Sequence, residues 1–267
     1  MPSPIAFPIG RTICAALLVA GALSLFVPQL RGQAATSSAP ERVPVLVELF
    51  TSEGCSDCPP ADALLAKLDA SQPIPSVQAV VLSEHVTYWN RLGWTDPFSL
   101  DAMTERQEDY VLRFGLNSSY TPQMVVDGTD QFVGSDGRAL VAAMTKEAKT
   151  PKQAIAIEGA AWDHGAAQFS VHANAPAGTK LLAVLAADAT HSEVARGENA
   201  GRTLHHTAVV RVMKEFGADA ANGRQLKLSG GPLTQKAEAA GPVRLVVFLV
   251  DRKTGHVLGA AQQTLRR

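Results

Sequence analysis

Two cysteines spaced as Cys-x-x-Cys are the residues of this chain best suited to chemistry. Cys55 and Cys58 follow an apolar run, residues 43–50, and precede a helical pattern that begins at Pro59. The free N–H groups and the positive dipole end of a helix start favour a cysteine thiolate. A thiolate with a second thiol nearby is the minimum needed for thiol–disulfide exchange. The order strand, Cys-x-x-Cys and helix therefore predicts a redox site.

The same pair is poorly suited to a purely structural role. A chain of this length needs no disulfide for stability, and closing so short a loop constrains the unfolded chain least. One alternative is a Cu(I) site formed by Cys55, Cys58 and His85, because soft thiolates suit Cu(I). Another is a non-catalytic binding module. For the redox interpretation we expect no cofactor, and a protein or small-molecule thiol or disulfide as the partner.

The N-terminal 35 residues have the form of an export signal. Arg11 is followed by the apolar stretch 12–27 and then by small and polar residues. This pattern is typical of a signal peptide, and the stretch is slightly short for a membrane-spanning helix. We interpret residues 1–35 as a signal peptide or N-terminal anchor and residues 36–42 as a linker. The protein is then extracytoplasmic, secreted or periplasmic, with membrane contact only through an uncleaved N-terminal segment.

Charge and length limit the other partners and the domain number. The formal net charge is −1, and charged residues make up 18% of the chain without a Lys/Arg run. This composition predicts no nucleic-acid partner. The 267 residues allow one large domain or two ordinary ones.

The elements that must position the cysteines change in type along the chain. In residues 43–150, strand patterns alternate with helical ones in the order β-α-β-α-β-β-α, with an Asp127-Gly128 turn in the last strand pair. The strands are expected at 43–50, 76–83, 123–126 and 131–133, and the helices at 59–68, 101–114 and from Asp136 to about 149. Residues 151–267 instead show period two, which predicts an all-β, sandwich-like second domain. Its strands are expected at 154–158, 167–172, 180–187, 203–215, 224–228, 243–250 and 256–264.

Residues 43–150 resemble the thioredoxin superfamily. The resemblance rests on the Cys pair at a strand–helix junction, on Thr121-Pro122 directly before a strand, and on the element order. It implies an α/β thioredoxin-like domain followed by the all-β domain. It also implies a cis Thr121–Pro122 bond beside the cysteines, where both residues bind the partner's backbone. Cys55 would attack as the thiolate, and Cys58 would resolve the mixed disulfide.

A narrower resemblance covers nearly the whole chain after the N-terminal segment. Four segments are similar to secreted thioredoxin-like proteins catalogued as a domain of unknown function, DUF1223: residues 50–62, 88–89, 92–98 and 197–204. This similarity implies a fold but no chemistry.

Two carboxylates bear on the reactivity of the cysteines. Asp57 lies between the two sulfurs and opposes thiolate formation, against the attraction of the helix dipole. Glu48 falls, with a one-residue insertion, where thioredoxins keep a buried acid. It is either a proton shuttle to Cys58 or a residue at the exposed rim of its strand, depending on its burial.

The loop that follows the second strand is rich in aromatic residues and begins with a histidine. His85 is a candidate base, substrate contact or metal ligand, or else a solvent-facing loop residue. Trp89 and Trp94 either line a substrate groove or cap the core.

A polar, glycine-punctuated loop at residues 196–202 and a histidine pair follow in the second half. The loop is either a contact that reaches the Cys site or simply a long hairpin connection. His205 and His206 point to opposite sides of a strand, which makes them unconvincing as a metal pair.

Overall fold

The computed structural model describes residues 42–234 and 241–267. Residues 1–35 and nearly all of the 36–42 linker lie outside this range. The described helices are α1 (Pro59–Ser71), α2 (Asp101–Phe114) and α3 (Gly137–Glu147). The described strands are β1 (Val43–Thr51), β2 (Val77–His85), β3 (Gln123–Val126), β4 (Asp130–Val133), β5 (Ile155–Asp163), β6 (Ala166–Ala173), β7 (Thr179–Glu193), β8 (Thr203–Gly217), β9 (Asn222–Ser229), β10 (Val243–Asp251) and β11 (Val257–Leu265). None of these helices is long and apolar enough to cross a membrane.

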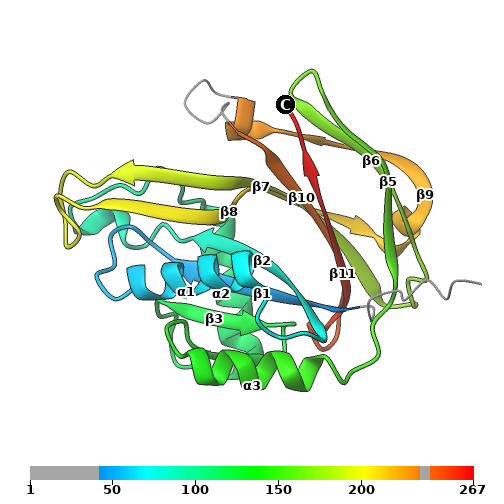
Figure 1. The fold of residues 1–267 in the computed structure, drawn as a ribbon, viewed down its shortest axis with the longest axis horizontal. Helices are drawn as coiled ribbons and strands as arrows, with labels where there is room; N and C mark the ends of the chain where they lie inside the picture. The colour runs from blue at the N-terminus through cyan, green and yellow to red at the C-terminus, as the bar shows by residue number, and fades with distance from the viewer. Residues whose placement is uncertain (1–41, 235–240) are drawn as a thin grey trace, which may run out of the picture. The chain divides into compact units, whose positions relative to one another are not determined.

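Eight strands form one mixed sheet in the order β11-β10-β7-β8-β2-β1-β3-β4 (Figure 1). β1 pairs in parallel with β2 and antiparallel with β3, and β3 and β4 form the expected hairpin. β2 pairs in parallel with β8 at Ser83 and Val209. Strands from both halves of the sequence therefore lie in one sheet.

The expected fold class, an α/β thioredoxin-like domain followed by a separate all-β domain, is wrong. The individual elements lie close to their predicted positions, and the order of the first seven is as predicted. The error concerns strand pairing. An open β2 edge would leave backbone N–H and C=O groups unpaired, and β8 from the second half pairs with that edge. Alternation identifies a strand but does not identify a partner more than a hundred residues away.

The remaining strands form a small antiparallel sheet in the order β5-β6-β9. Its apolar residues Phe169, Val171 and Leu226 share a core with Leu185 of β7 and Val247 of β10. The small sheet thus packs against the large mixed sheet, and the predicted separate, sandwich-like β domain is not formed.

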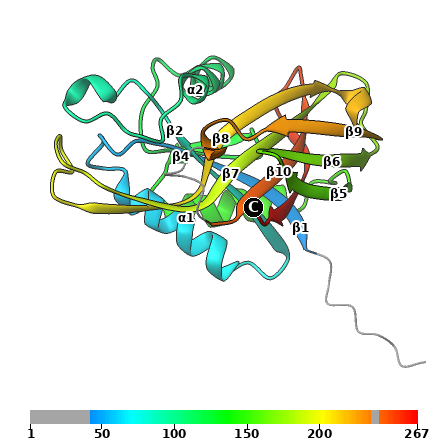
Figure 2. The same ribbon diagram turned by 90° about the horizontal axis from the view of Figure 1, so that it is seen from above.

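Helices α1 and α2 cover opposite faces of the β1–β2 region (Figure 2). Alternation along β1 explains this arrangement, because successive side chains point to opposite faces. Val47 and Leu49 belong to the core that includes Leu65 of α1. On the other face, the Phe50 ring packs edge-on against Tyr110 of α2, with centroids 5.8 Å apart. The end of β1 is therefore held between two helices, and the loop that follows it carries the cysteines.

Candidate functional site

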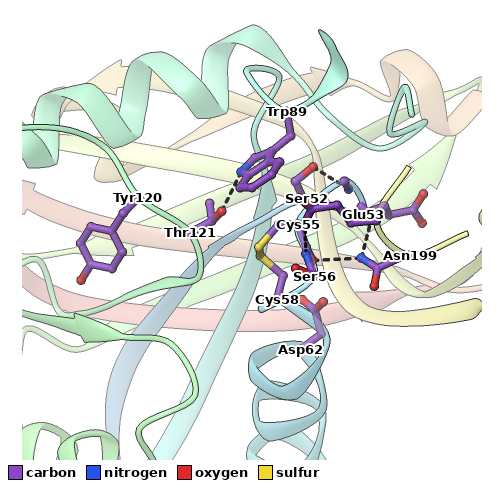
Figure 3. Close-up of a disulfide and its surroundings, with 12 residues drawn as sticks. Ser52, Glu53, Cys55, Ser56, Cys58, Asp62, Trp89, Tyr120, Thr121 and Asn199 are labelled. Atoms are coloured by element: carbon purple, nitrogen blue, oxygen red, sulfur yellow. Dashed lines mark hydrogen bonds between the residues drawn. A yellow bond between two sulfur atoms is a disulfide. The ribbon is translucent and has the colours of Figure 1, made fainter. Parts of the chain in front are cut away.

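Cys55 and Cys58 form a disulfide at the start of α1 (Figure 3). Their Cα atoms are 5.4 Å apart. Cys58 is the N-cap residue of α1, and Pro59 occupies the first turn. The predicted order of strand, Cys-x-x-Cys and helix is confirmed. Both cysteines are nearly covered in the disulfide form, with Cys55 and Cys58 1% and 0% exposed.

The disulfide segment is covered by the connection between β7 and β8, residues 194–202, which we call the hairpin tip. The buried Asn199 side-chain amide donates to the backbone carbonyls of Glu53 and Cys55, at 2.9 Å each. Next to it, Glu198 accepts a hydrogen bond from the Ser56 N–H at 3.0 Å. The loop predicted at residues 196–202 is thus a hairpin connection that also reaches the Cys site.

Glu53, two residues before Cys55, receives contacts from three separate segments. Its fully buried carboxylate accepts hydrogen bonds from the Trp94 indole N–H at 2.8 Å and from the Ser192 hydroxyl of β7. His206 of β8 lies 3.1 Å from the same carboxylate. A carboxylate held this way fixes the loop that carries Cys55, because moving the loop would leave several buried donors unpaired.

His206 is a buried histidine between two acids. Its Nε2 lies 3.1 Å from Glu53 and its Nδ1 lies 3.8 Å from Asp62 of α1. Its ring also meets the His85 ring edge-to-face, with centroids 4.6 Å apart. Burial lowers the pKa of His206, but the carboxylates of Asp62 and Glu53 outweigh burial and raise that pKa to about 9. His206 is therefore an imidazolium at neutral pH.

His85 is fully buried at the end of β2 rather than facing solvent. Its Nδ1 lies 2.7 Å from Asp96, while its Nε2 has no hydrogen-bond partner. Asp96 also accepts backbone hydrogen bonds from Glu53 and Phe98. Burial raises the pKa of Asp96, but His85 and these N–H groups outweigh burial and hold that pKa below its usual value. Asp96 thus joins the aromatic loop to the Cys loop.

The alternative Cu(I) site of Cys55, Cys58 and His85 stays a prediction, because both cysteines are joined in the disulfide. Among residues 42–234 and 241–267, no group of three or more His, Cys, Asp or Glu side chains is arranged to hold a metal ion.

Trp89 and Thr121 lie on the other side of the Cys loop (Figure 3). The half-buried Trp89 donates its indole N–H to the Thr121 hydroxyl at 2.8 Å. A Cβ atom on Gly54 would lie 3.1 Å from Trp89 Cβ, so glycine allows this close approach. The Thr121–Pro122 bond is cis, as expected, and Pro122 is buried. The Cys loop is therefore held between the hairpin tip on one side and Trp89 on the other, with the half-buried Trp94 bonded to Glu53.

Glu48 is buried rather than at the rim of its strand, and its partners lie on α2. Its carboxylate accepts hydrogen bonds from Arg106 at 2.7 Å and from the Tyr110 hydroxyl at 2.6 Å. In the described part of the chain, no hydrogen bond joins Glu48 to either cysteine. The predicted shuttle from Glu48 to Cys58 therefore gains no support from these contacts.

Glu84 is a second buried acid in this cluster, and neither of its oxygens has a hydrogen-bond partner. Arg106 Nε is the nearest cation, 3.5 Å away. Burial, followed by the charge of Glu48, raises the pKa of Glu84 well above its ordinary value of 4.5. Glu84 is therefore held in its neutral form at a pH where an exposed glutamate is ionised.

Glu84→Gln is expected to stabilise the protein increasingly as pH rises. A folded-state pKa above the unfolded one means that the contribution of Glu84 is fully present below the unfolded pKa. It is lost as pH rises through the folded pKa. Glutamine mimics the neutral acid and avoids this loss. Urea unfolding in acidic, neutral and alkaline buffers measures the difference, with the exposed Glu108→Gln as control. A gain that is the same at every pH would contradict this assignment.

Several residues of the site were missed from sequence. Glu53, Asp62 and Asn199 stand in the segments similar to DUF1223, but nothing in the sequence distinguishes them from solvated polar residues. The one available signal at Glu53 is a carboxylate two residues after the end of a buried strand. His206 was considered only together with His205, whereas its partners come from the Cys loop and α1.

The fold and site define a class of mixed-sheet protein in which a helix-capping Cys-x-x-Cys disulfide lies beneath a β-hairpin. A family model described as "Protein of unknown function (DUF1223)" matches residues 46–249, and the chain belongs to this family. The narrower resemblance is thereby confirmed, whereas the assignment to the thioredoxin superfamily is not.

Two solved structures are similar to the chain. Protein AGR_C_4864 from Agrobacterium tumefaciens is 25% identical, with a TM-score of 0.60, over 84% of this chain and 95% of that one. HBP35 of Porphyromonas gingivalis is 12% identical, with a TM-score of 0.51, over 85% and 77%, which shows similarity of fold alone. No match was found among curated protein sequences.

Proposed function

We propose that this protein is an extracytoplasmic thiol–disulfide oxidoreductase that acts through Cys55 and Cys58. The observation that carries the proposal is the pairing of these cysteines at the N-terminus of α1. A helix start stabilises the thiolate that exchange requires. The compartment is inferred from the signal-like residues 1–35, since disulfides persist outside the cytoplasm.

The reaction needs only a partner thiol. A substrate thiolate attacks Cys55 Sγ and forms a mixed disulfide, while the Cys55–Cys58 bond breaks and Cys58 leaves as a thiolate. A second substrate thiolate then attacks the substrate sulfur of the mixed disulfide, which releases the substrate disulfide and the Cys55 thiolate. The protein disulfide is reduced to a dithiol as two thiols are oxidised, and the reverse sequence reduces a substrate disulfide.

The partner must reach a sulfur that is nearly covered. Trp89 and Trp94 are half-buried beside the Cys loop, and Leu92 between them is 55% exposed. Trp89 lies against Gly54 and Trp94 is bonded to Glu53, so both aromatic rings lie next to the Cys loop. They suit a protein or small-molecule thiol with apolar neighbours. Access requires the hairpin tip or Trp89 to move.

Cys55→Ser is expected to lower exchange activity by about a hundredfold or more, because the thiolate is the nucleophile. Cys58→Ser is expected to accumulate a mixed disulfide through Cys55, which mass spectrometry detects. Release of a coloured thiolate from an aromatic disulfide measures activity of the reduced protein. Asp109→Asn, an exposed change on α2, is the control.

Two results would contradict the proposal. One is a reduced wild-type protein that does not react with the aromatic disulfide at all. The other is stoichiometric Cu(I) binding that depends on the cysteines, together with an absence of exchange. The second result would favour the metal-binding alternative.

A further inference from the structure

Asp62 lies within one helical turn of Cys58. The Cys58 carbonyl accepts the Asp62 backbone N–H at 3.1 Å, in the first turn of α1. Figure 3 shows the Asp62 carboxylate pointing from α1 toward the Cys55–Cys58 segment. The residue is 6% exposed, and its Oδ1 is buried without a hydrogen-bond partner. A buried carboxylate oxygen with no partner, one turn from a disulfide, calls for an explanation.

The other oxygen of Asp62 faces His206. Its Oδ2 lies 3.8 Å from His206 Nδ1, and that nitrogen has no hydrogen-bond partner either. On the opposite side of the ring, Nε2 is held by Glu53. The charged or titratable groups that face His206 are therefore Glu53 from the Cys loop, Asp62 from α1 and His85 from β2, whose own partner is Asp96.

Thiol–disulfide exchange requires a proton at Cys58, and Asp62 and His206 are placed to supply it. When the disulfide opens, Cys58 becomes a thiolate at a position that is 0% exposed. An uncompensated buried charge is costly, so a proton must reach the sulfur without bulk water. The imidazolium of His206 is a buried proton source, and it faces Asp62, which lies in the first turn of α1 next to Cys58.

We propose that Asp62 carries a proton to and from Cys58 Sγ, and that His206, held by Glu53, is the positioning residue that stores this proton. This inference rests on the proposed thiol–disulfide exchange. When the Cys55–Cys58 bond breaks, the proton on His206 Nδ1 passes to Asp62, and Asp62 gives its proton to the Cys58 thiolate. The products are a Cys58 thiol and a neutral imidazole. In the reverse step Cys58 returns the proton, and its thiolate attacks Cys55 in the mixed disulfide and releases the substrate thiolate.

The test follows the reduced protein with an aromatic disulfide that releases a coloured thiolate. The first release reports attack by Cys55, and the second reports resolution by Cys58. Asp62→Asn is expected to slow the second release about tenfold to a hundredfold near neutral pH, in line with the lower range of general acid–base effects. The first release should stay unchanged, and alkaline buffer should restore the second, since hydroxide then removes the proton from Cys58.

Two further variants keep the inference testable. His206→Gln carries the same expectation if Asp62→Asn does not fold. The exposed Asp109→Asn removes an equal charge elsewhere and should leave both releases unchanged. A normal second release in a folded Asp62→Asn or His206→Gln protein would overturn the relay while leaving the oxidoreductase proposal standing. Absence of the first release in the wild type would instead overturn the oxidoreductase proposal.

Discussion

Arg106→Met is expected to lower the free energy of unfolding by about 3–5 kcal/mol, the usual cost of removing one partner of a buried ion pair. Arg106 lies between two fully buried acids, Glu48 and Glu84, and donates to the Tyr110 hydroxyl at 3.2 Å. Without the guanidinium, Glu48 is left as a buried carboxylate with one neutral donor. Methionine keeps most of the side-chain volume, so the loss reports charge rather than a cavity. Urea unfolding at neutral pH measures it.

Two controls separate charge from packing in this experiment. The double variant Arg106→Met with Glu48→Gln removes both members of the pair and should recover much of the lost stability, because a neutral amide is cheaper to bury than an unpaired carboxylate. Arg138→Met makes the same substitution at an exposed position of α3 and should change little. If the double variant is as unstable as the sum of the two single variants, the pairing of Arg106 with Glu48 is not the cause.

This cluster shows why local sequence does not settle burial. Residues 43–50 were recognisable as a strand, and Asp101–Phe114 as a helix with its exact bounds. Whether Glu48 lies at a rim or in the core depends on which helix covers that face of β1. The partner of Glu48 is 58 residues away on α2. Periodicity predicts to which face of its own helix or strand a side chain points, but it does not predict which other element packs on that face.

The same limit explains the wrong fold class. The strands of the second half were identified by alternation, and β7 was expected at 180–187 but extends to Glu193. β7 and β8 stay paired as far as Glu193 and Thr203. This added length places the hairpin tip at the Cys loop. Within the largely polar segment 188–202, Ser192, Glu198 and Asn199 hydrogen-bond groups of the Cys loop, whereas most of the other residues are exposed.

The candidate site was predictable to the extent that its chemistry is local. Cys55, Cys58 and the helix start are consecutive, so their arrangement follows from one strand–helix junction. Glu53, Asp62 and His206 meet only after β8 pairs with β2, which brings residues more than a hundred positions apart into contact. No pattern in the sequence predicts that these three residues come into contact.

Asn199→Ala is expected to raise the rate at which dithiothreitol reduces the Cys55–Cys58 disulfide by about tenfold to a hundredfold. The substitution removes the two hydrogen bonds that the Asn199 side chain donates to the Cys loop, and it leaves the bond between Glu198 and the Ser56 N–H. Each such bond contributes about 1 kcal/mol net, and about 1.4 kcal/mol changes an equilibrium tenfold. Because both sulfurs are buried, reduction requires opening of their cover, and the reduction rate follows the open fraction.

Arg196→Ala is the matched control for this prediction, since Arg196 is an exposed residue of the same hairpin tip. Its reduction rate should equal that of the wild type. The dependence on urea distinguishes local from global opening, because only global unfolding exposes enough surface to respond steeply to denaturant. A shallow urea dependence, with a faster Asn199→Ala protein, supports a cover that opens locally. A steep dependence in the wild type, or an unchanged rate in Asn199→Ala, would show that the hairpin tip does not control access to the disulfide.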